Sequence, residues 1–329
     1  MVSRVGGGNM KRNIAAFCAV LMLAHMIACS AAPSEPQATS EQPKPIPVTP
    51  LIISMITPTP SATPQPTATP VPTIDAQWYR ERNETLEKLI RQYRPTESDA
   101  DIRQDIQRMA IDPNKPMIAL TFDDGPIYGI TDKILDVLEQ YNARATFFVL
   151  GWRFRHEESN DILRRAVALG CEIGNHTWSH DRLPGQNYVG VRHEVVNTNK
   201  VIFDIAGVLP HCLRPPGGQN TYEAMRVARE NGMMVVLWSQ SGNVHEVDPA
   251  KIAQNVEKQI VDGDVLEDGD IVLLHDTHYN MIDAVKIIVP KLIEEGYQLV
   301  TVWELLNCAD QPPVPGKVYD RQGAPKEMR

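Results

Sequence analysis

The chain has 329 residues, of which 43 % are hydrophobic and 22 % are charged, and this composition is typical of a globular protein rather than a disordered or fibrous one. The formal net charge of −9 argues against a protein that binds phosphate backbones, so we expect no nucleic acid partner. Five cysteines are too few for a scaffold held together by disulfides.

The first 32 residues have the layout of an export signal. Basic residues precede an apolar run over residues 14–28, and small residues follow it. The run is shorter than the ~20 residues that span a bilayer. We therefore interpret residues 1–29 as a signal peptide, with a buried helix of the mature fold as the alternative. The stretch Met26-Ile27-Ala28-Cys29 resembles a bacterial lipobox, which implies lipidation of Cys29; cleavage near Ala31 and full release is the competing outcome.

Two segments separate this signal from the main domain. Residues 30–74 are rich in Pro and Thr, with 12 prolines between residues 33 and 72, and are predicted to form a disordered spacer. Extended polyproline rises ~3.1 Å per residue, so the spacer could reach on the order of 120 Å. Residues 75–111 carry apolar side chains at helical spacing and predict a helical extension. Its apolar face indicates packing on the neighbouring domain; a coil that binds a partner is the alternative.

From residue 112 onward, β-rich runs alternate with helical patterns. The runs cover residues 117–122, 145–150, 172–174, 233–238, 271–274 and 298–302. The helical patterns cover residues 131–141, 161–169, 195–205, 221–231, 249–261 and 284–294. This alternation predicts an α/β fold with a parallel sheet, and about 200 residues fit a closed or nearly closed barrel better than an open sheet. We place this domain at residues 112–309 and interpret residues 310–329 as a flexible tail.

In such folds the active site lies at the carboxyl ends of the strands. The first strand ends in Asp123 and Asp124, two carboxylates that raise each other's pKa unless a cation separates their roles; a solvated Asp-Gly-Pro turn is the alternative. The third strand is followed by His176 and His180, whose spacing of four suits a divalent metal but also arises by chance. Two His and one Asp predict a three-ligand metal site with an open position, as in hydrolytic zinc sites and in iron oxygenases.

Two further strand ends carry polar residues. Arg214-Pro215-Pro216-Gly217 is either an ordinary loop or an arginine aimed at a carboxylate, followed by free backbone amides. His275 directly follows a buried strand and is either a core residue or part of the site.

Together these motifs resemble, in sequence order, those of the polysaccharide deacetylases, carbohydrate esterase family 4 (NodB homology), over residues 115–307. They are Thr121-Phe122-Asp123-Asp124-Gly125-Pro126, His176-Thr177-Trp178-Ser179-His180, Arg214-Pro215-Pro216 and Leu273-Leu274-His275. The resemblance implies a deformed (β/α) barrel of about seven parallel strands and metal-dependent removal of acetyl groups from N-acetylated sugars.

The resemblance also implies a role for each matching residue. Asp123 would be the catalytic base, Arg214 would orient it, and His275 would be the general acid. The metal ligands would be Asp124, His176 and His180. Zinc is the expected ion, with cobalt or another transition metal as alternatives.

The substrate side of the implied site shows two departures from the family. Gly217 stands where many members have an aromatic residue, which keeps the backbone amide for the oxyanion but removes a wall of the groove. By analogy, Trp238 and Leu273 would enclose the acetyl methyl group. Asn243 stands where an Asp commonly pairs with the acid histidine, so we expect the pKa of His275 to be lower than in Asp-containing members. Asn243→Asp should then extend activity to higher pH.

These observations predict an exported metal-dependent hydrolase that releases acetate from an N-acetylated glycan outside the cytoplasm. N-acetylglucosamine of peptidoglycan is the nearest abundant substrate for a barrel on a long spacer, and chitin-like chains, N-acetylmuramic acid and acetylated xylan are alternatives. We expect a monomer, held at the outer face of the cell membrane only through a lipid anchor, or else secreted or wall-bound. A non-catalytic sugar-binding lipoprotein on the same barrel is the alternative from another class. A metal oxygenase is disfavoured because Asp123 and His275 would then have no role.

Overall fold

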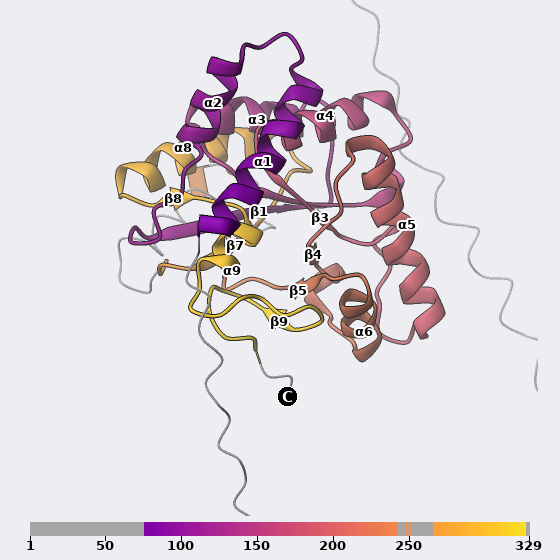
Figure 1. The fold of residues 1–329 in the computed structure, drawn as a ribbon. Coiled ribbons are helices and arrows are strands. Elements are labelled where there is room, and N and C mark those ends of the chain that lie inside the picture. Colours follow the sequence, from indigo (N-terminus) through magenta and orange to yellow (C-terminus); the bar gives the residue numbers. More distant parts are fainter. Residues whose placement is uncertain (1–75, 243–247, 249, 252–265, 327–329) are drawn as a thin grey trace, which may run out of the picture. The chain divides into compact units, whose positions relative to one another are not determined.

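The computed structural model describes residues 76–242, 248, 250–251 and 266–326 (Figure 1). Its helices are α1 Ala76–Tyr93, α2 Asp99–Arg108, α3 Thr131–Gln140, α4 Glu157–Ala168, α5 Tyr188–Ala206, α6 Tyr222–Glu230, α8 Asn280–Glu294 and α9 Val302–Asn307, with short 3-10 helices η1 Gly151–Arg153 and η2 Pro216–Gly218. Its strands are β1 Met117–Asp123, β2 Thr146–Val149, β3 Glu172–Asn175, β4 Cys212–Leu213, β5 Met234–Val236, β6 Gln240–Ser241, β7 Asp270–His275, β8 Gln298–Leu299 and β9 Val318–Tyr319. The expected signal peptide, the spacer and most of the expected helix at 249–261 lie outside the described residues.

The strands pair in the order β6-β7-β1-β2-β3-β4-β5-β9, all in parallel, and β8 pairs with the first residues of β1. Strands β5 and β6 lie near opposite ends of this order, yet only residues 237–239 separate them along the chain. The sheet must therefore curl until its two sides meet. An antiparallel bridge between Asp270 and Arg321 links the two sides as well. The α/β fold with a deformed barrel of parallel strands is confirmed.

The alternation of side chains along β1 separates two cores. Ile118, Leu120 and Phe122 belong to the core shared with the helices, and Met117 and Ala119 belong to a second core. Because residues two apart in a strand share a face, Met117 and Ala119 share theirs with the last residue of the strand, Asp123. The second core draws buried side chains from β1, β2, β4, β5, β7 and β9 and so fills the inside of the barrel. Helices α8, α3, α4, α5 and α6 pack side by side around the outside (Figure 1).

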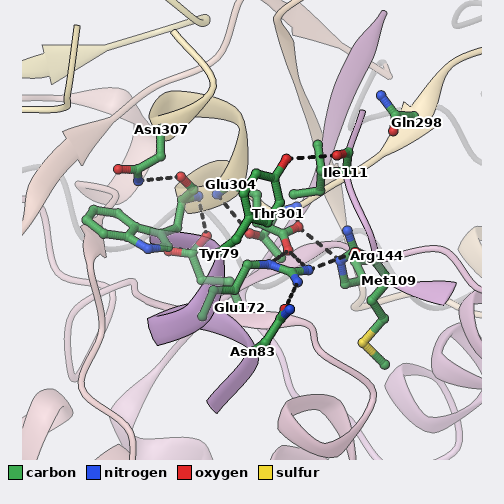
Figure 2. Close-up of polar contacts among 12 residues, drawn as sticks. Tyr79, Asn83, Met109, Ile111, Arg144, Glu172, Gln298, Thr301, Glu304 and Asn307 are labelled. Atoms are coloured by element: carbon green, nitrogen blue, oxygen red, sulfur yellow. Dashed lines mark hydrogen bonds and ion pairs between the residues drawn. The ribbon is translucent and has the colours of Figure 1, made fainter. Parts of the chain in front are cut away.

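The helical extension packs on the barrel, as expected from its apolar face. Ile90 and Ile102 are fully buried, and the Tyr93 hydroxyl donates to the carbonyl oxygen of Ala206 at 2.9 Å. The strongest link is an ion cluster. The carboxylate of Glu304 on α9 accepts from Arg82 Nε of α1 at 2.9 Å and from Arg144 Nε at 2.9 Å. Figure 2 shows Glu304 beside Thr301 and Arg144, with Tyr79 of α1 bonded to the Ile111 carbonyl nearby.

The expectation of a flexible tail over residues 310–329 is corrected by the structure. Strand β9 pairs with β5, and its residues Val318 and Tyr319 are buried. Tyr319 joins the core inside the barrel, so apolar burial holds this segment in place despite the prolines before it. Helices in the described ranges include none that is both long and apolar enough to cross a bilayer.

Candidate active site

The register of the sheet brings the predicted site residues to one end of the barrel. Asp123 at the end of β1 is paired with His275 at the end of β7. Asn175 at the end of β3 is paired with Leu213, so the next residues, His176 and Arg214, leave their strands at the same level. All of these positions are carboxyl ends of parallel strands, where the sequence analysis placed them.

Asp123 is held by a buried arginine. Arg214 has no exposed surface, and its Nη1 donates to Asp123 Oδ1 at 2.7 Å and to Thr121 Oγ1 at 2.7 Å. Its guanidinium lies 4.0 Å from the centre of the Phe148 ring and also donates to two backbone carbonyls. Burial lowers the pKa of Arg214, and the negative charge of Asp123 opposes this. One carboxylate oxygen of Asp123 is therefore fixed, while Oδ2 lies 3.6 Å from His176 Nε2.

Asp124, His176 and His180 form a cluster whose ligand atoms all lie within 4.8 Å of one another. Asp124 Oδ1 is 3.5 Å from His176 Nε2 and 3.3 Å from His180 Nε2. His176 Nδ1 donates to the Arg214 carbonyl oxygen at 2.7 Å, which leaves the lone pair of Nε2 directed at the cluster. Burial lowers the pKa of His176, against the charges of Asp123 and Asp124, and so favours the neutral imidazole that ligates metals.

These three residues fit a divalent cation. Asp124 Oδ1 is buried and has no hydrogen-bond partner among the described residues. A buried carboxylate oxygen without a donor is costly, and a metal ion in the cluster would satisfy it. The donor set of two imidazoles and one carboxylate, with an open position, occurs in hydrolytic zinc sites and in iron oxygenases.

The backbone conformation of Asp124 explains why the carboxylates of two adjacent residues face different partners. Asp123 is in the extended strand, but Asp124 has a left-handed φ of 77°, which carries a strain of about 1–3 kcal/mol in a residue with a side chain. Two hydrogen bonds hold the backbone of Asp124 in this conformation. Asp124 N donates to the Phe148 carbonyl at 3.2 Å, and Arg153 Nε donates to the Asp124 carbonyl at 3.0 Å. Sequence reasoning missed Arg153, because a hydrogen bond from a side chain to a backbone carbonyl leaves no spacing pattern.

A buried carboxylate supports the same turn from behind. Asp276 has no exposed surface, accepts a hydrogen bond from Thr131 Oγ1, and lies against Gly125, where a Cβ atom would be 2.1 Å from Asp276 Oδ2. Only glycine therefore fits after Asp124. Burial raises the pKa of Asp276 to about 7. Asp276 directly follows His275, but no pattern in the sequence had indicated a role for this residue.

The histidine loop has its own anchor. Thr177 and His180 have left-handed φ angles of 72° and 66°. Glu194 of α5 accepts from the backbone amides of Trp178 at 2.9 Å and Ser179 at 2.8 Å. These bonds fix the loop, so His176 and His180 face the same point although neither residue lies in a helix.

His275 lies at the mouth of the barrel beside the cluster. Its side chain is 23 % exposed, and Nε2 is 3.9 Å from Asp124 Oδ2. Nδ1 is buried and has no hydrogen-bond partner among the described residues. Asn243, the expected partner of this ring, lies outside the described residues, so the expectation for Asn243 stays a prediction.

Three of the predicted substrate residues, Gly217, Trp238 and Leu273, lie near the carboxyl ends of β4, β5 and β7. Gly217 is exposed with a left-handed φ of 62°, and within the described chain its amide donates to no protein acceptor. A Cβ at Gly217 would have no atom within 4 Å, which is open space where an aromatic wall is missing. The Trp238 ring lies 5.7 Å from the Arg214 guanidinium and against Gly218. Leu273 is 5 % exposed and lies two residues before His275 on the same face of β7.

Comparison with known proteins agrees with this geometry. Residues 110–236 match the family model for polysaccharide deacetylases. The chain is 39 % identical over 204 residues to a peptidoglycan-N-acetylmuramic acid deacetylase of Bacillus subtilis, covering 61 % of this chain and 41 % of that protein. It is 37 % identical over 199 residues to a peptidoglycan-N-acetylglucosamine deacetylase of Bacillus cereus, covering 59 % of this chain and 90 % of that protein.

A solved structure gives the same result for the fold. A family 4 acetyl xylan esterase from Clostridium thermocellum, in complex with a cobalt ion, superposes with a TM-score of 0.55 at 31 % identity, over 62 % of this chain and 98 % of that one. Relatives of high coverage therefore share both the sequence motifs and the curled parallel sheet. The chain belongs to the polysaccharide deacetylase family, carbohydrate esterase family 4.

Proposed function

We propose that this protein is a metal-dependent deacetylase that hydrolyses N-acetyl groups of a glycan outside the cytoplasm, with N-acetylglucosamine of peptidoglycan as its substrate. The observation that carries the proposal is the division between the two adjacent carboxylates. Asp123 is bonded to Arg214, whereas Asp124 faces two imidazoles. One carboxylate is thus available as a base beside a cation held by the other.

The reaction is the hydrolysis of an acetamide by one water molecule to acetate and an amine. A divalent ion held by Asp124, His176 and His180 would polarise the acetamide carbonyl and lower the pKa of water. Asp123 Oδ2 takes the proton from the attacking water, because Oδ1 is occupied by Arg214. The free amide of Gly217 is the backbone donor for the negative charge that develops on the carbonyl oxygen.

The leaving amine needs a proton before it can depart. His275, at the mouth of the barrel and partly exposed, is the group that can donate it, since histidine is the commonest general acid in enzymes. Asp123 has then gained one proton and His275 has lost one. Exchange with solvent restores both residues, so the overall reaction consumes only one water. Leu273 and Trp238 provide apolar surface near the centre for the acetyl methyl group.

Zinc is the ion we propose, because the donor set of two His and one Asp is typical of hydrolytic zinc sites. The cobalt ion in the related acetyl xylan esterase supports a transition metal, and cobalt is the alternative.

The substrate proposal is supported by relatives and by the first 74 residues. The relatives from Bacillus subtilis and Bacillus cereus are a peptidoglycan-N-acetylmuramic acid deacetylase and a peptidoglycan-N-acetylglucosamine deacetylase, whereas the relative from Clostridium thermocellum is an acetyl xylan esterase. An export signal, a lipobox-like Cys29 and a spacer long enough to reach into a wall favour a substrate in the cell envelope. Each relative's activity belongs to that protein, and the choice between the two sugars is part of the proposal.

Acetate release tests the proposal. The zinc-loaded protein is incubated with N-acetylated peptidoglycan and, separately, with N-acetylglucosamine oligomers, and chelated protein and Asp123→Asn are the controls. We expect metal-dependent acetate release that Asp123→Asn lowers by about 10²–10⁴-fold. Folded, metal-loaded protein that releases no acetate from either glycan would contradict the proposal and favour a sugar-binding protein.

A further inference from the structure

The mouth of the barrel carries exposed aromatic side chains that the proposed chemistry does not use. Tyr128 is 68 % exposed and Tyr279 is 70 % exposed. Large apolar groups left in water at neighbouring positions are typical of a binding surface, whereas single ones are ordinary. The question is therefore whether these two tyrosines are neighbours.

The register of the sheet indicates that they are. Tyr128 follows Asp124 by four residues after β1, and Tyr279 follows His275 by four residues after β7. Strands β1 and β7 pair in parallel with Asp123 opposite His275, so the two loops leave the sheet side by side. The two loops approach each other closely, because a Cβ added to Gly129 would lie 3.6 Å from the Tyr279 hydroxyl.

Neither side chain contributes a hydrogen bond or core packing to the described part of the protein. Both phenol groups lack a hydrogen-bond partner there, and neither ring belongs to a core cluster. Tyr279 is the N-cap residue of α8 but makes no capping hydrogen bond with its side chain. The exposed tyrosine at the opposite end, Tyr141, follows the last residue of α3, far along the chain from any residue of the site.

The chemistry of these rings selects the partner. A sugar ring has an apolar C–H face and a polar edge, and an aromatic ring with a hydroxyl matches both. The adjacent loops carry no Lys or Arg over residues 125–130 and 276–280, so they do not select an anionic chain. We propose that Tyr128 and Tyr279 form a stacking platform for a neighbouring sugar of the glycan whose acetyl group is removed. This inference rests on the proposed function and adds a preference for extended chains.

Two substrates of different length test the platform. The first is a hexamer of N-acetylglucosamine, and the second is an aryl acetate, which presents an acyl group without a sugar. The zinc-loaded double variant Tyr128→Ala/Tyr279→Ala should lose about tenfold in kcat/KM on the hexamer and stay within twofold of wild type on the aryl acetate. Tyr141→Ala, at the other end of the barrel, should leave both values unchanged.

The outcomes separate the two proposals. Wild-type protein that releases no acetate from the hexamer or from N-acetylated peptidoglycan contradicts the proposed function itself. Where only peptidoglycan is deacetylated, the same variants are compared on peptidoglycan. Active wild-type protein with an equally active double variant overturns the platform alone. An equal loss on hexamer and aryl acetate overturns it too, because the tyrosines would then act on the chemistry rather than on the chain. Tyr128→Phe/Tyr279→Phe keeps the rings and should keep at least half of the hexamer activity.

Discussion

The two ends of the barrel bury charged groups in opposite ways. At the amino end, Glu304 has both carboxylate oxygens bonded, one to Arg82 and the other to Arg144 and the Thr301 amide. Burial alone would raise the pKa of Glu304, but the two arginines outweigh it and hold this pKa below its ordinary value. The protein itself neutralises this carboxylate.

At the carboxyl end Arg214 neutralises Asp123, but other buried polar atoms are left without a partner. Asp124 Oδ1, Thr177 Oγ1, His275 Nδ1 and Asp276 Oδ1 are all buried without a hydrogen-bond partner among the described residues. Buried polar atoms are nearly always paired, so a group of unpaired ones around two carboxylates and two imidazoles indicates a place for a ligand. The ion cluster at the amino end therefore contributes to stability, whereas the carboxyl end is built for a cation and a substrate.

The largest expected effect tests the amino end. Glu304→Gln keeps the shape and the capping box of α9 but leaves Arg82 and Arg144 without a carboxylate. We expect a loss of about 3–5 kcal/mol in the free energy of unfolding, measured by urea denaturation, with unchanged kcat per folded molecule. Glu87→Gln removes one of the two partners of the exposed Arg91 and should cost at most about 1 kcal/mol. Equal losses in the two variants would break the comparison.

A smaller effect tests the support of the metal ligand. Arg153→Ala removes the donor to the Asp124 carbonyl but no ligand atom. We expect zinc affinity, measured by competition with a chromophoric chelator, to fall about 10–100-fold. Arg164→Ala, an arginine of α4 whose partners are Glu157 and Asp161, is the control and should leave the affinity unchanged. Unchanged affinity in Arg153→Ala would show that the turn at Asp124 needs no such support.

A third test concerns the dependence of stability on pH. Because burial raises the pKa of Asp276 to about 7, its folded-state pKa lies above the unfolded value of 3.8. The folded state therefore holds a proton that the unfolded chain releases, and stability falls as pH rises from about 4 to about 7, by up to about 1.4 kcal/mol per pH unit. Asp276→Asn should flatten this slope in urea unfolding of the metal-free protein. A slope as steep as that of wild type would contradict this role for Asp276.

The sequence predicted which residues form the site better than it predicted the long-range contacts that stabilise the fold. Asp123, His176, Arg214 and His275 each follow a buried apolar strand, and parallel strands bring such positions to one end. The contact between Arg82 and Glu304 joins residues 222 positions apart, and no local pattern reports it. Such contacts depend on how the extension packs, which only the folded chain reveals.

Element boundaries failed for local reasons. The helix expected at residues 195–205 begins at Tyr188, because Asn187 caps it by accepting from the Gly190 amide. The prediction of a flexible tail was wrong because it relied on the prolines of this segment and did not detect β9, a strand of two residues. A two-residue strand has no periodicity to detect, so only its pairing with β5 identifies it.

The most direct test of the account is a calorimetric titration of metal-free protein with zinc, in parallel with His180→Ala. His180 is 42 % exposed, and its side chain interacts with Asp124 and His176 of the cluster, so its loss should leave the stability of the metal-free protein nearly unchanged. The account predicts one ion per chain, an affinity at least 100-fold weaker in His180→Ala, and acetate release that rises in proportion to bound metal. Acetate release that persists in fully chelated protein, or equal affinity in the two proteins, would contradict it.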